Sequence, residues 1–342
     1  MNPEFKLDNF KQGTQKLKPK TANGSNIFVC KTANEWIVDA SAKDIPESLY
    51  LSIWHEGEIG FLIGSTNTGK SLLAVKLALD IAKNRKVIYV DLEMSDIQFR
   101  LRYTEDGNEY KFPENFLRVE FKDKYVIPDK EDNTDYIIKC FEEIRSTHES
   151  KVIIIDNVTY LGSSLGTSKD VLPLLRKLKD WQRSVEGLSL LILAHTPKRP
   201  DSQPLTINDI FGSSMQGNFC DVAFAIGHSV LDNHWRYVKQ LKARLCAIEY
   251  DSTNVIIYEI NKQNDGLLSL DFKEYKSERE HTIKEYDPTE NPLETSWEIA
   301  YNFKKEGKNY SEIGIEMNVS HTTASKYVKR HEEILKKKKT DK

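Results

Sequence analysis

The sequence of 342 residues predicts an α/β protein with a mostly parallel sheet, an antiparallel extension and a small all-helical domain. Three observations predict this class. Short apolar strands alternate with helical patterns over residues 56–272, which is typical of a parallel sheet with helices on both faces. The last strand patterns of this region follow one another without a helix between them. From Leu293 onward the pattern is wholly helical.

Each element is predicted from its apolar pattern. We expect parallel strands at 60–63, 86–90, 117–121, 152–155, 189–194 and 222–226, and helices at 72–83, 134–146 and 171–185. The antiparallel strands are expected at 236–242, 254–259 and 267–271. The predicted domains are an N-terminal arm or cover (1–45), the α/β domain (46–272), a charged linker with two prolines (273–292), a helical domain (293–335) and a basic tail (336–342).

The composition is ordinary for a globular protein, with 39% hydrophobic and 30% charged residues and a net charge of −3. Residues 292–342 hold 11 Lys or Arg against 8 Asp or Glu, so this end is basic. The tail of four lysines at 336–339 fits a solubilising tail as well as a phosphate contact. The four cysteines form no C-x-x-C pair, and no apolar run approaches the ~18 residues of a membrane span. We therefore expect a cytoplasmic protein without a membrane partner.

The most informative motif is a complete G-x-x-x-x-G-K-S sequence between the first predicted strand and the helix at 72–83. It consists of Gly64, Ser65, Thr66, Asn67, Thr68, Gly69, Lys70 and Ser71. In such a loop, backbone N–H groups and the helix N-terminus bind phosphates. Lys70 is placed to reach the β- and γ-phosphates, and the Ser71 hydroxyl to bind Mg²⁺. The motif predicts binding of a nucleoside triphosphate.

Hydrolysis also requires a carboxylate for the metal and a base for the attacking water. Asp156 ends the apolar strand at 152–155, where it can hold Mg²⁺ partly through water. Glu93 and Asp91 both follow the strand at 86–90, and either could instead cap the next helix. Glu93 is the preferred candidate for the base.

Several segments resemble RecA-type ATPases of the DnaB, RepA and RadA branches, with RepA-like ATPases of plasmids and mobile elements nearest. The matching segments are Asp91-Leu92-Glu93-Met94-Ser95 with Gln98 and Arg100, Ala194-His195-Thr196-Pro197-Lys198, Gly212-Ser213-Ser214 with Asp221, and Lys242-Ala243-Arg244. The resemblance covers residues 56–272 and implies a RecA-like core with ATP and Mg²⁺ as cofactors.

The resemblance also implies a role for individual residues. Glu93 would polarise the attacking water, and His195 would sense the γ-phosphate unless it is simply a buried histidine. Lys242 and Arg244 would cross to the γ-phosphate of a neighbouring subunit, or else be a pair of surface charges. The family implies a homo-oligomeric ring, hexameric or heptameric.

Two loops are candidates for DNA contact because the corresponding loops of RecA-type rings line the central channel. They are residues 160–168, rich in Gly and Ser, and 196–209, which carries Lys198 and Arg199. Small residues beside cations suit single-strand binding, although flexible solvent loops would have the same composition.

A helix-turn-helix pattern begins at Ser311, which we expect to cap a first helix with Ile313 and Met317 facing inward. Asn318 is suited to the turn, because asparagine tolerates a left-handed backbone conformation. Val319 is expected to pack in the core, and Ser320 is expected to cap a second helix. A preceding support helix would contribute Trp297, Ile299, Ala300 and Phe303. The second helix would present His321, Thr322, Lys326 and Arg330 to DNA. The alternative is a three-helix satellite for protein contacts.

These features lead to two functional hypotheses. The first is a Mg²⁺-dependent ATPase acting on DNA as a ring helicase or translocase in replication or transfer of a mobile element. The second is an ATP-switched DNA-binding regulator that recruits replication or recombination proteins without unwinding. A small-molecule kinase is disfavoured because the sequence has no lid or substrate-binding motif.

Overall fold

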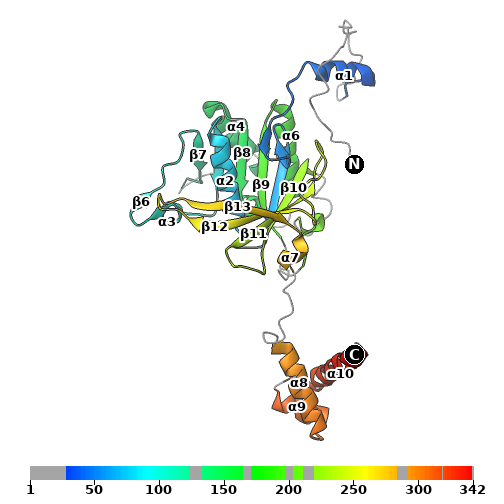
Figure 1. Ribbon diagram of the computed structural model, residues 1–342. Helices are drawn as coiled ribbons and strands as arrows, with labels where there is room; N and C mark the ends of the chain where they lie inside the picture. Colours follow the sequence, from blue (N-terminus) through cyan, green and yellow to red (C-terminus); the bar gives the residue numbers. More distant parts are fainter. Residues whose placement is uncertain are drawn as a thin grey trace. The chain divides into compact units, whose positions relative to one another are not determined.

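The computed structural model describes residues 28–122, 132–164, 171–196, 203–210, 219–282, 292–317 and 319–340. The chain divides into two compact units, Met1–Ile283 and Lys284–Lys342 (Figure 1). Among the described residues, no helix is both long and apolar enough to span a bilayer.

The first unit is built on a nine-stranded sheet with the order β13-β12-β11-β10-β3-β9-β8-β4-β7. The strands from β10 to β7 are parallel to one another, and β11, β12 and β13 extend the sheet antiparallel. The predicted fold class is therefore confirmed. The strand bounds are β3 Ile59–Gly64, β4 Val87–Asp91, β7 Phe116–Val119, β8 Val152–Asp156, β9 Ser189–His195, β10 Val222–His228, β11 Trp235–Lys242, β12 Val255–Lys262 and β13 Leu268–Lys276.

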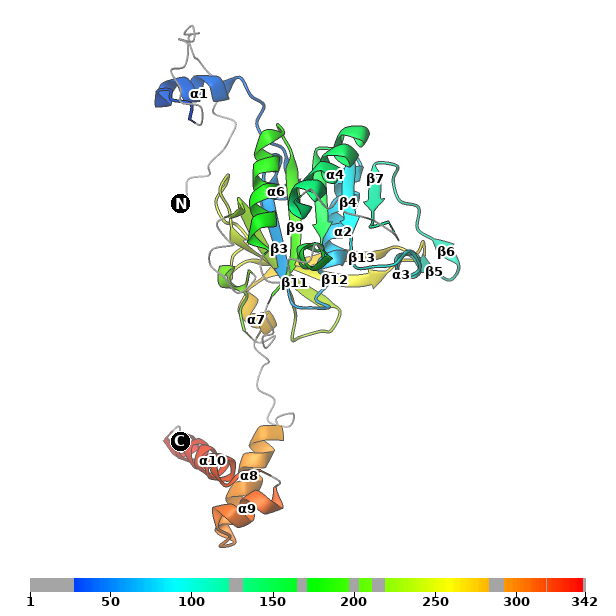
Figure 2. The same cartoon turned by 180° about the vertical axis from the view of Figure 1, so that it is seen from behind.

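Helices cover both faces of this sheet (Figures 1 and 2). On one face the core contains α2 (Lys70–Ala82), and on the other α4 (Asn133–His148), α5 (Val158–Ser164) and α6 (Leu172–Ser184). Alternate residues of β3 pack into the cores on the two faces of the sheet. Leu62 packs on the face covered by α2, whereas Phe61 and Ile63 pack on the face covered by α4, α5 and α6. The continuous apolar pattern of β3 is thus explained, because its residues are buried on both faces of the sheet.

Shorter elements surround the sheet. They are α1 Ala33–Ser41, β1 Ser48–Tyr50, β2 Trp54–His55, α3 Asp96–Arg102, β5 Thr104–Glu105, β6 Asn108–Glu109, the 3₁₀ turn η2 Ile207–Asp209 and α7 Glu278–Thr282. The pairs β1–β2 and β5–β6 form separate two-stranded sheets. Helix α1 has a capping box between Thr32 and Glu35 and buries none of its residues.

The first half of the segment that the sequence predicts as a linker is folded. Strand β13 continues to Lys276, and α7 follows it. Glu278 is buried, where it pairs with Lys239 at 2.6 Å and accepts a hydrogen bond from the Leu205 N–H at 3.2 Å. A charge-rich composition predicts a solvated linker, but it does not reveal a carboxylate that is neutralised by a distant lysine. Residues 283–291 lie outside the described residues.

The second unit contains three helices, α8 Pro292–Lys305, α9 Tyr310–Glu316 and α10 His321–Thr340. Ala300, Ile313, Ala324 and Val328 form its core, and Phe303, Met317 and Val319 pack against them. A Cβ on Gly314 would lie 2.7 Å from the Val319 carbonyl oxygen, so only glycine fits where α9 meets the following turn. The Ser320 hydroxyl accepts a hydrogen bond from the Thr323 N–H at 3.1 Å, as expected for a cap.

One detail of the predicted helical module is wrong. Helix α9 begins one residue before Ser311, and Asn309 caps it through a capping box with Glu312. Asn309 is as good a cap as serine, and the pattern alone did not decide between them. Ile299 lies on the predicted support helix, where it is 41% exposed, and Ala300 of the same helix belongs to the core. Asn318 lies outside the described residues.

Candidate functional site

The phosphate-binding loop connects β3 to α2 at the centre of the sheet. Asn67 and Gly69 have φ angles of 63° and 95°, and Gly69 is the N-cap of α2. A Cβ on Gly64 would lie 2.6 Å from the Ile226 carbonyl oxygen and 2.7 Å from the Thr68 hydroxyl. Glycine at 64 and 69 therefore lets the loop curl tightly against β10, with its backbone turned toward a ligand.

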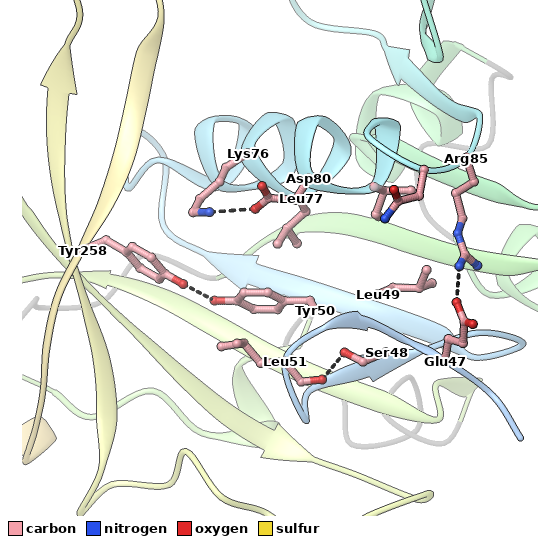
Figure 3. Close-up of a pocket in the computed structure, with 12 residues that line it drawn as sticks. Glu47, Ser48, Leu49, Tyr50, Leu51, Lys76, Leu77, Asp80, Arg85 and Tyr258 are labelled. Carbon is pink, nitrogen blue, oxygen red and sulfur yellow. Dashed lines mark hydrogen bonds and ion pairs between the residues drawn. The ribbon is translucent and has the colours of Figure 1, made fainter. Parts of the chain in front are cut away.

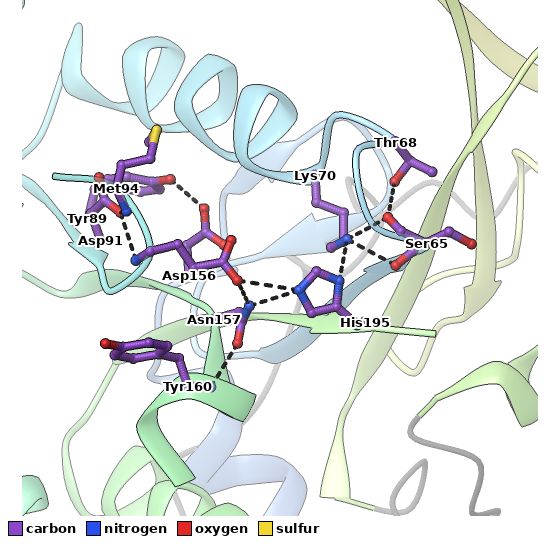
Figure 4. A network of polar contacts seen from close by, with 12 residues as sticks. Ser65, Thr68, Lys70, Tyr89, Asp91, Met94, Asp156, Asn157, Tyr160 and His195 are labelled. Atoms are coloured by element: carbon purple, nitrogen blue, oxygen red, sulfur yellow. Dashed lines mark hydrogen bonds and ion pairs between the residues drawn. The ribbon is translucent and has the colours of Figure 1, made fainter. Parts of the chain in front are cut away.

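Lys70 is buried at the start of α2. Its Nζ donates to the carbonyl oxygens of Gly64 and Ser65 at 2.9 and 2.8 Å and lies 3.1 Å from His195 Nδ1 (Figure 4). Burial lowers the pKa of Lys70 to about 8, although the carboxylates of Asp156 and Glu93 act in the opposite direction. The ammonium is thus held by neutral acceptors in a place where phosphate oxygens would be stronger partners.

Asp156 is the last residue of β8 and lies beside the last residue of β4, Asp91, in the sheet register. The Tyr89 hydroxyl donates to its Oδ2 at 2.6 Å. Burial raises the pKa of Asp156 to about 6, while hydrogen bonds from Ser71 and Tyr89 lower it. A buried carboxylate at this edge of the sheet fits a hard divalent cation, because such a cation would favour the charged carboxylate.

Glu93, Asn157 and His195 form one polar network beside Lys70. The Asn157 side-chain amide donates to Glu93 Oε1 and lies 3.0 Å from His195 Nε2, and His195 Nε2 is 3.3 Å from the same glutamate oxygen. The hydrogen bond from His195 is the main cause of the lowered pKa of Glu93. His195 aligns with Gly64 in the register of β9 and β3, which explains why these side chains meet at one edge of the sheet.

The two acids after β4 have different surroundings. Asp91 is buried, pairs with Arg118 at 3.0 Å, and accepts hydrogen bonds from the N–H groups of Glu93 and Met94. Glu93 lines the same pocket as Lys70 and Ser71. The geometry favours Glu93 over Asp91 as a base, since only Glu93 faces the phosphate-binding loop.

Three residues of the site have no role in the sequence-based prediction. Asn157 directly follows Asp156 in the sequence. This adjacency is the one sequence feature that could have identified Asn157 as a site residue. Arg102 ends α3 and lines the pocket with Lys70 and Glu93. Arg236 is buried on β11, where its Nε donates to the Thr68 carbonyl oxygen at 2.9 Å. This hydrogen bond ties the phosphate-binding loop to the antiparallel part of the sheet. The full lining is Thr66, Asn67, Gly69, Lys70, Ser71, Leu72, Glu93, Arg102, His195, Ile260 and Leu268.

Comparison with known proteins decides the family. A sequence family described as an AAA domain matches residues 31–201, half of the chain. The chain belongs to this AAA-domain family. It is a P-loop ATPase, with the phosphate-binding loop inside the matched region. A solved structure of a KaiC-like protein from the archaeon Pyrococcus horikoshii is similar to 64% of this chain and 91% of its own, at 15% identity and a TM-score of 0.46. No curated protein matches the chain.

Lys242 and Arg244 of this AAA-domain protein lie away from its own phosphate-binding loop. Lys242 pairs with Ala223 near the start of β10, whereas the loop leaves β3 at the opposite end of the parallel strands. The Lys242 ammonium donates to the Cys220 carbonyl oxygen at 2.8 Å. Arg244 is 51% exposed and pairs with Asp221 at 3.0 Å. Neither residue lines the nucleotide pocket.

The DNA-contact candidates are only partly described. Lys198 and Arg199 lie outside the described residues, as do parts of both candidate loops. His321, Thr322, Lys326 and Arg330 are all exposed on α10. The last three are spaced four residues apart and so share one helix face. The His321 ring contacts Tyr310, and Arg330 pairs with Glu333 at 3.1 Å.

A second pocket of the AAA-domain unit lies between α2 and β1 (Figure 3). Its floor includes Leu49, Tyr50 and Leu77, and its charged residues already have partners. Lys76 pairs with Asp80 at 2.8 Å, and Arg85 pairs with Glu47. None of the predicted site residues lines this pocket, so it has no part in the site.

Proposed function

We propose that the chain is a Mg²⁺-dependent, DNA-associated ATPase of the RepA-like branch that acts as a ring, as a helicase or translocase of a mobile element. The observation that carries the proposal is the presence of two units in one chain. One holds a phosphate-binding loop with a candidate base. The other is a three-helix unit with the predicted helix-turn-helix spacing, whose last helix exposes Thr322, Lys326 and Arg330.

The proposed chemistry assigns one task to each side chain. Lys70 neutralises the β- and γ-phosphates, and Glu93 accepts a proton from the attacking water. His195 contacts the γ-phosphate, so that its bond to Glu93 reports whether the phosphate is present. Ser71 and Asp156 would hold Mg²⁺, partly through water, and the metal would offset phosphate charge.

The placement of Lys242 and Arg244 supports the proposed ring. Both are near the end of the parallel strands opposite the phosphate-binding loop, and Arg244 is half exposed. A cation that completes the charge balance at the transferring phosphate is worth several orders of magnitude in rate. In a head-to-tail ring, the neighbouring subunit would supply it.

Strand displacement separates this proposal from the ATP-switched regulator. With a forked duplex, ATP and Mg²⁺, a motor displaces the labelled strand, and Lys70→Ala does not. A protein that binds duplex in an ATP-dependent way but displaces no strand would instead be the regulator, which selects DNA through α10 and recruits replication or recombination proteins.

The DNA role of α10 predicts a change in salt dependence. Lys326→Gln with Arg330→Gln should weaken duplex binding and reduce the slope of log K against log[salt] by about 1 for each lost phosphate contact. Fluorescence anisotropy over a salt series measures this slope. Lys83→Gln is the charge control, since Lys83 is exposed on the α/β unit and pairs with its sequence neighbour Asp80 at 2.7 Å. An unchanged slope in the double variant would remove α10 from the interface.

A further inference from the structure

Arg118 on strand β7 makes contacts along the whole segment that carries Glu93. Its Nε donates to Asp91 Oδ2 at 3.0 Å, its Nη2 to the Met94 carbonyl oxygen at 2.8 Å, and its Nη1 to Asp96 Oδ1 at 2.6 Å. These three acceptors lie on both sides of Glu93 in the sequence. One planar guanidinium therefore bridges the turn from the end of β4 to the start of α3.

Asp91 connects Arg118 to the backbone of Glu93 by hydrogen bonds. Asp91 Oδ1 accepts hydrogen bonds from the N–H groups of Glu93 and Met94 at 3.2 and 3.0 Å, while Oδ2 accepts from Arg118. Asp91 is buried, and a buried carboxylate without its cation would be costly. Arg118 thus satisfies the group that fixes the backbone of the candidate base.

Two further contacts hold Arg118 itself. Its guanidinium lies 4.7 Å from the centroid of the Phe99 ring on α3 and 3.1 Å from Glu120. Strand β7 pairs directly with β4, so that Arg118 is opposite Tyr89 in the register. The arginine is therefore anchored on the sheet and on α3 at once, and its own position is well defined.

We propose that Arg118 is a positioning residue for hydrolysis, which holds Glu93 at the nucleotide site through Asp91 and the Met94 carbonyl. The proposal rests on the proposed function, in which Glu93 is the base. The hydrogen-bond and ion-pair partners of Arg118 (Asp91, Met94, Asp96 and Glu120) do not line the nucleotide pocket, so Arg118 acts on the reaction through the Glu93 segment.

The proposal predicts a loss of turnover without a loss of ATP affinity. Arg118→Ala should lower kcat by about tenfold to a hundredfold, because small misplacement of a reacting group has an effect of that size. The ATP dissociation constant should stay within about twofold. Arg118→Lys should give an intermediate kcat, because an ammonium cannot reproduce the planar fork.

The control is Arg145→Ala. Arg145 on α4 is 16% exposed, compared with 17% for Arg118, and binds Glu142 through two nitrogens at 2.7 and 2.6 Å. Its variant removes a similar ion pair that lies outside the nucleotide site. We expect kcat within about twofold of the unchanged protein, after a check of folding by near-ultraviolet circular dichroism.

A double-mutant cycle that combines Arg118→Ala with Glu93→Gln, measured in single-turnover assays, tests whether Arg118 acts through Glu93. If Arg118 acts through Glu93, Arg118→Ala should reduce the residual rate of Glu93→Gln by less than about twofold. The same loss in both backgrounds, a parallel loss of ATP binding, or an equal loss in Arg145→Ala would overturn the proposal. If Arg118→Ala does not fold, the cycle is run with Arg118→Lys. Unchanged turnover in Glu93→Gln alone would instead contradict the base assignment in the proposed function.

Discussion

Glu93→Gln should leave ATP bound and slow its hydrolysis by about 10²–10⁴-fold, the usual contribution of a general base. Glutamine keeps the size of the side chain and can still bond to Asn157 and His195, but it cannot accept a proton from water. ATP affinity, measured with a fluorescent analogue, should stay within about threefold because Lys70 and the loop are unchanged.

Glu109→Gln is the control for this variant. Glu109 is exposed on β6, where it pairs with Arg100 at 2.7 Å, and its loss should leave turnover unaltered. Unaltered turnover in Glu93→Gln would assign the role of base to another acid. Asp91 would be a poor substitute, since its carboxylate is already bound by Arg118 and two backbone N–H groups.

Arg244→Ala should lower turnover by about 10³–10⁵-fold, as expected for a cation that reaches the transferring phosphate. Lys70→Ala should be inactive and bind nucleotide weakly. If the two residues act in one shared site, an equal mixture of the variants should recover activity at about a quarter of the sites, because some interfaces then combine an intact Lys70 with an intact Arg244.

The mixing experiment needs proof that subunits exchange, which differently labelled proteins can give by energy transfer. Lys43→Ala is the surface control, since Lys43 is also an exposed, ion-paired cation, which pairs with Glu186 at 3.4 Å. It should neither lose activity nor complement Lys70→Ala. Mixtures that exchange subunits but recover no activity would contradict a site completed by the neighbour.

The sequence predicts the elements that bury apolar residues on a regular period. The strands before Gly64 and Asp156 are apolar throughout, because helices cover both faces of the sheet, and their pattern alone places them. The phosphate-binding loop is equally predictable, since its glycines are required by φ angles and close contacts. Helices with a single apolar face, such as α4 and α6, are predicted from the 3.6-residue period in the same way.

The sequence does not predict side chains that act through distant partners. Arg118 and Arg236 look like ordinary strand arginines until the fold brings them to Asp91 and to the Thr68 carbonyl oxygen. Glu278 is a second example, because a buried pair with Lys239 cannot be seen in a charged segment. Long-range pairs of this kind depend on topology, and no local pattern encodes them.

The central claim is that ATP hydrolysis by this chain is coupled to DNA, and turnover with and without single-stranded DNA tests it most directly. The full chain with ATP and Mg²⁺ should hydrolyse ATP about tenfold faster when single-stranded DNA is added, as expected if DNA organises the ring and its shared sites. Lys70→Ala should show no turnover in either condition. A rate that single-stranded and double-stranded DNA both leave unchanged, in protein that binds ATP, would contradict the claim.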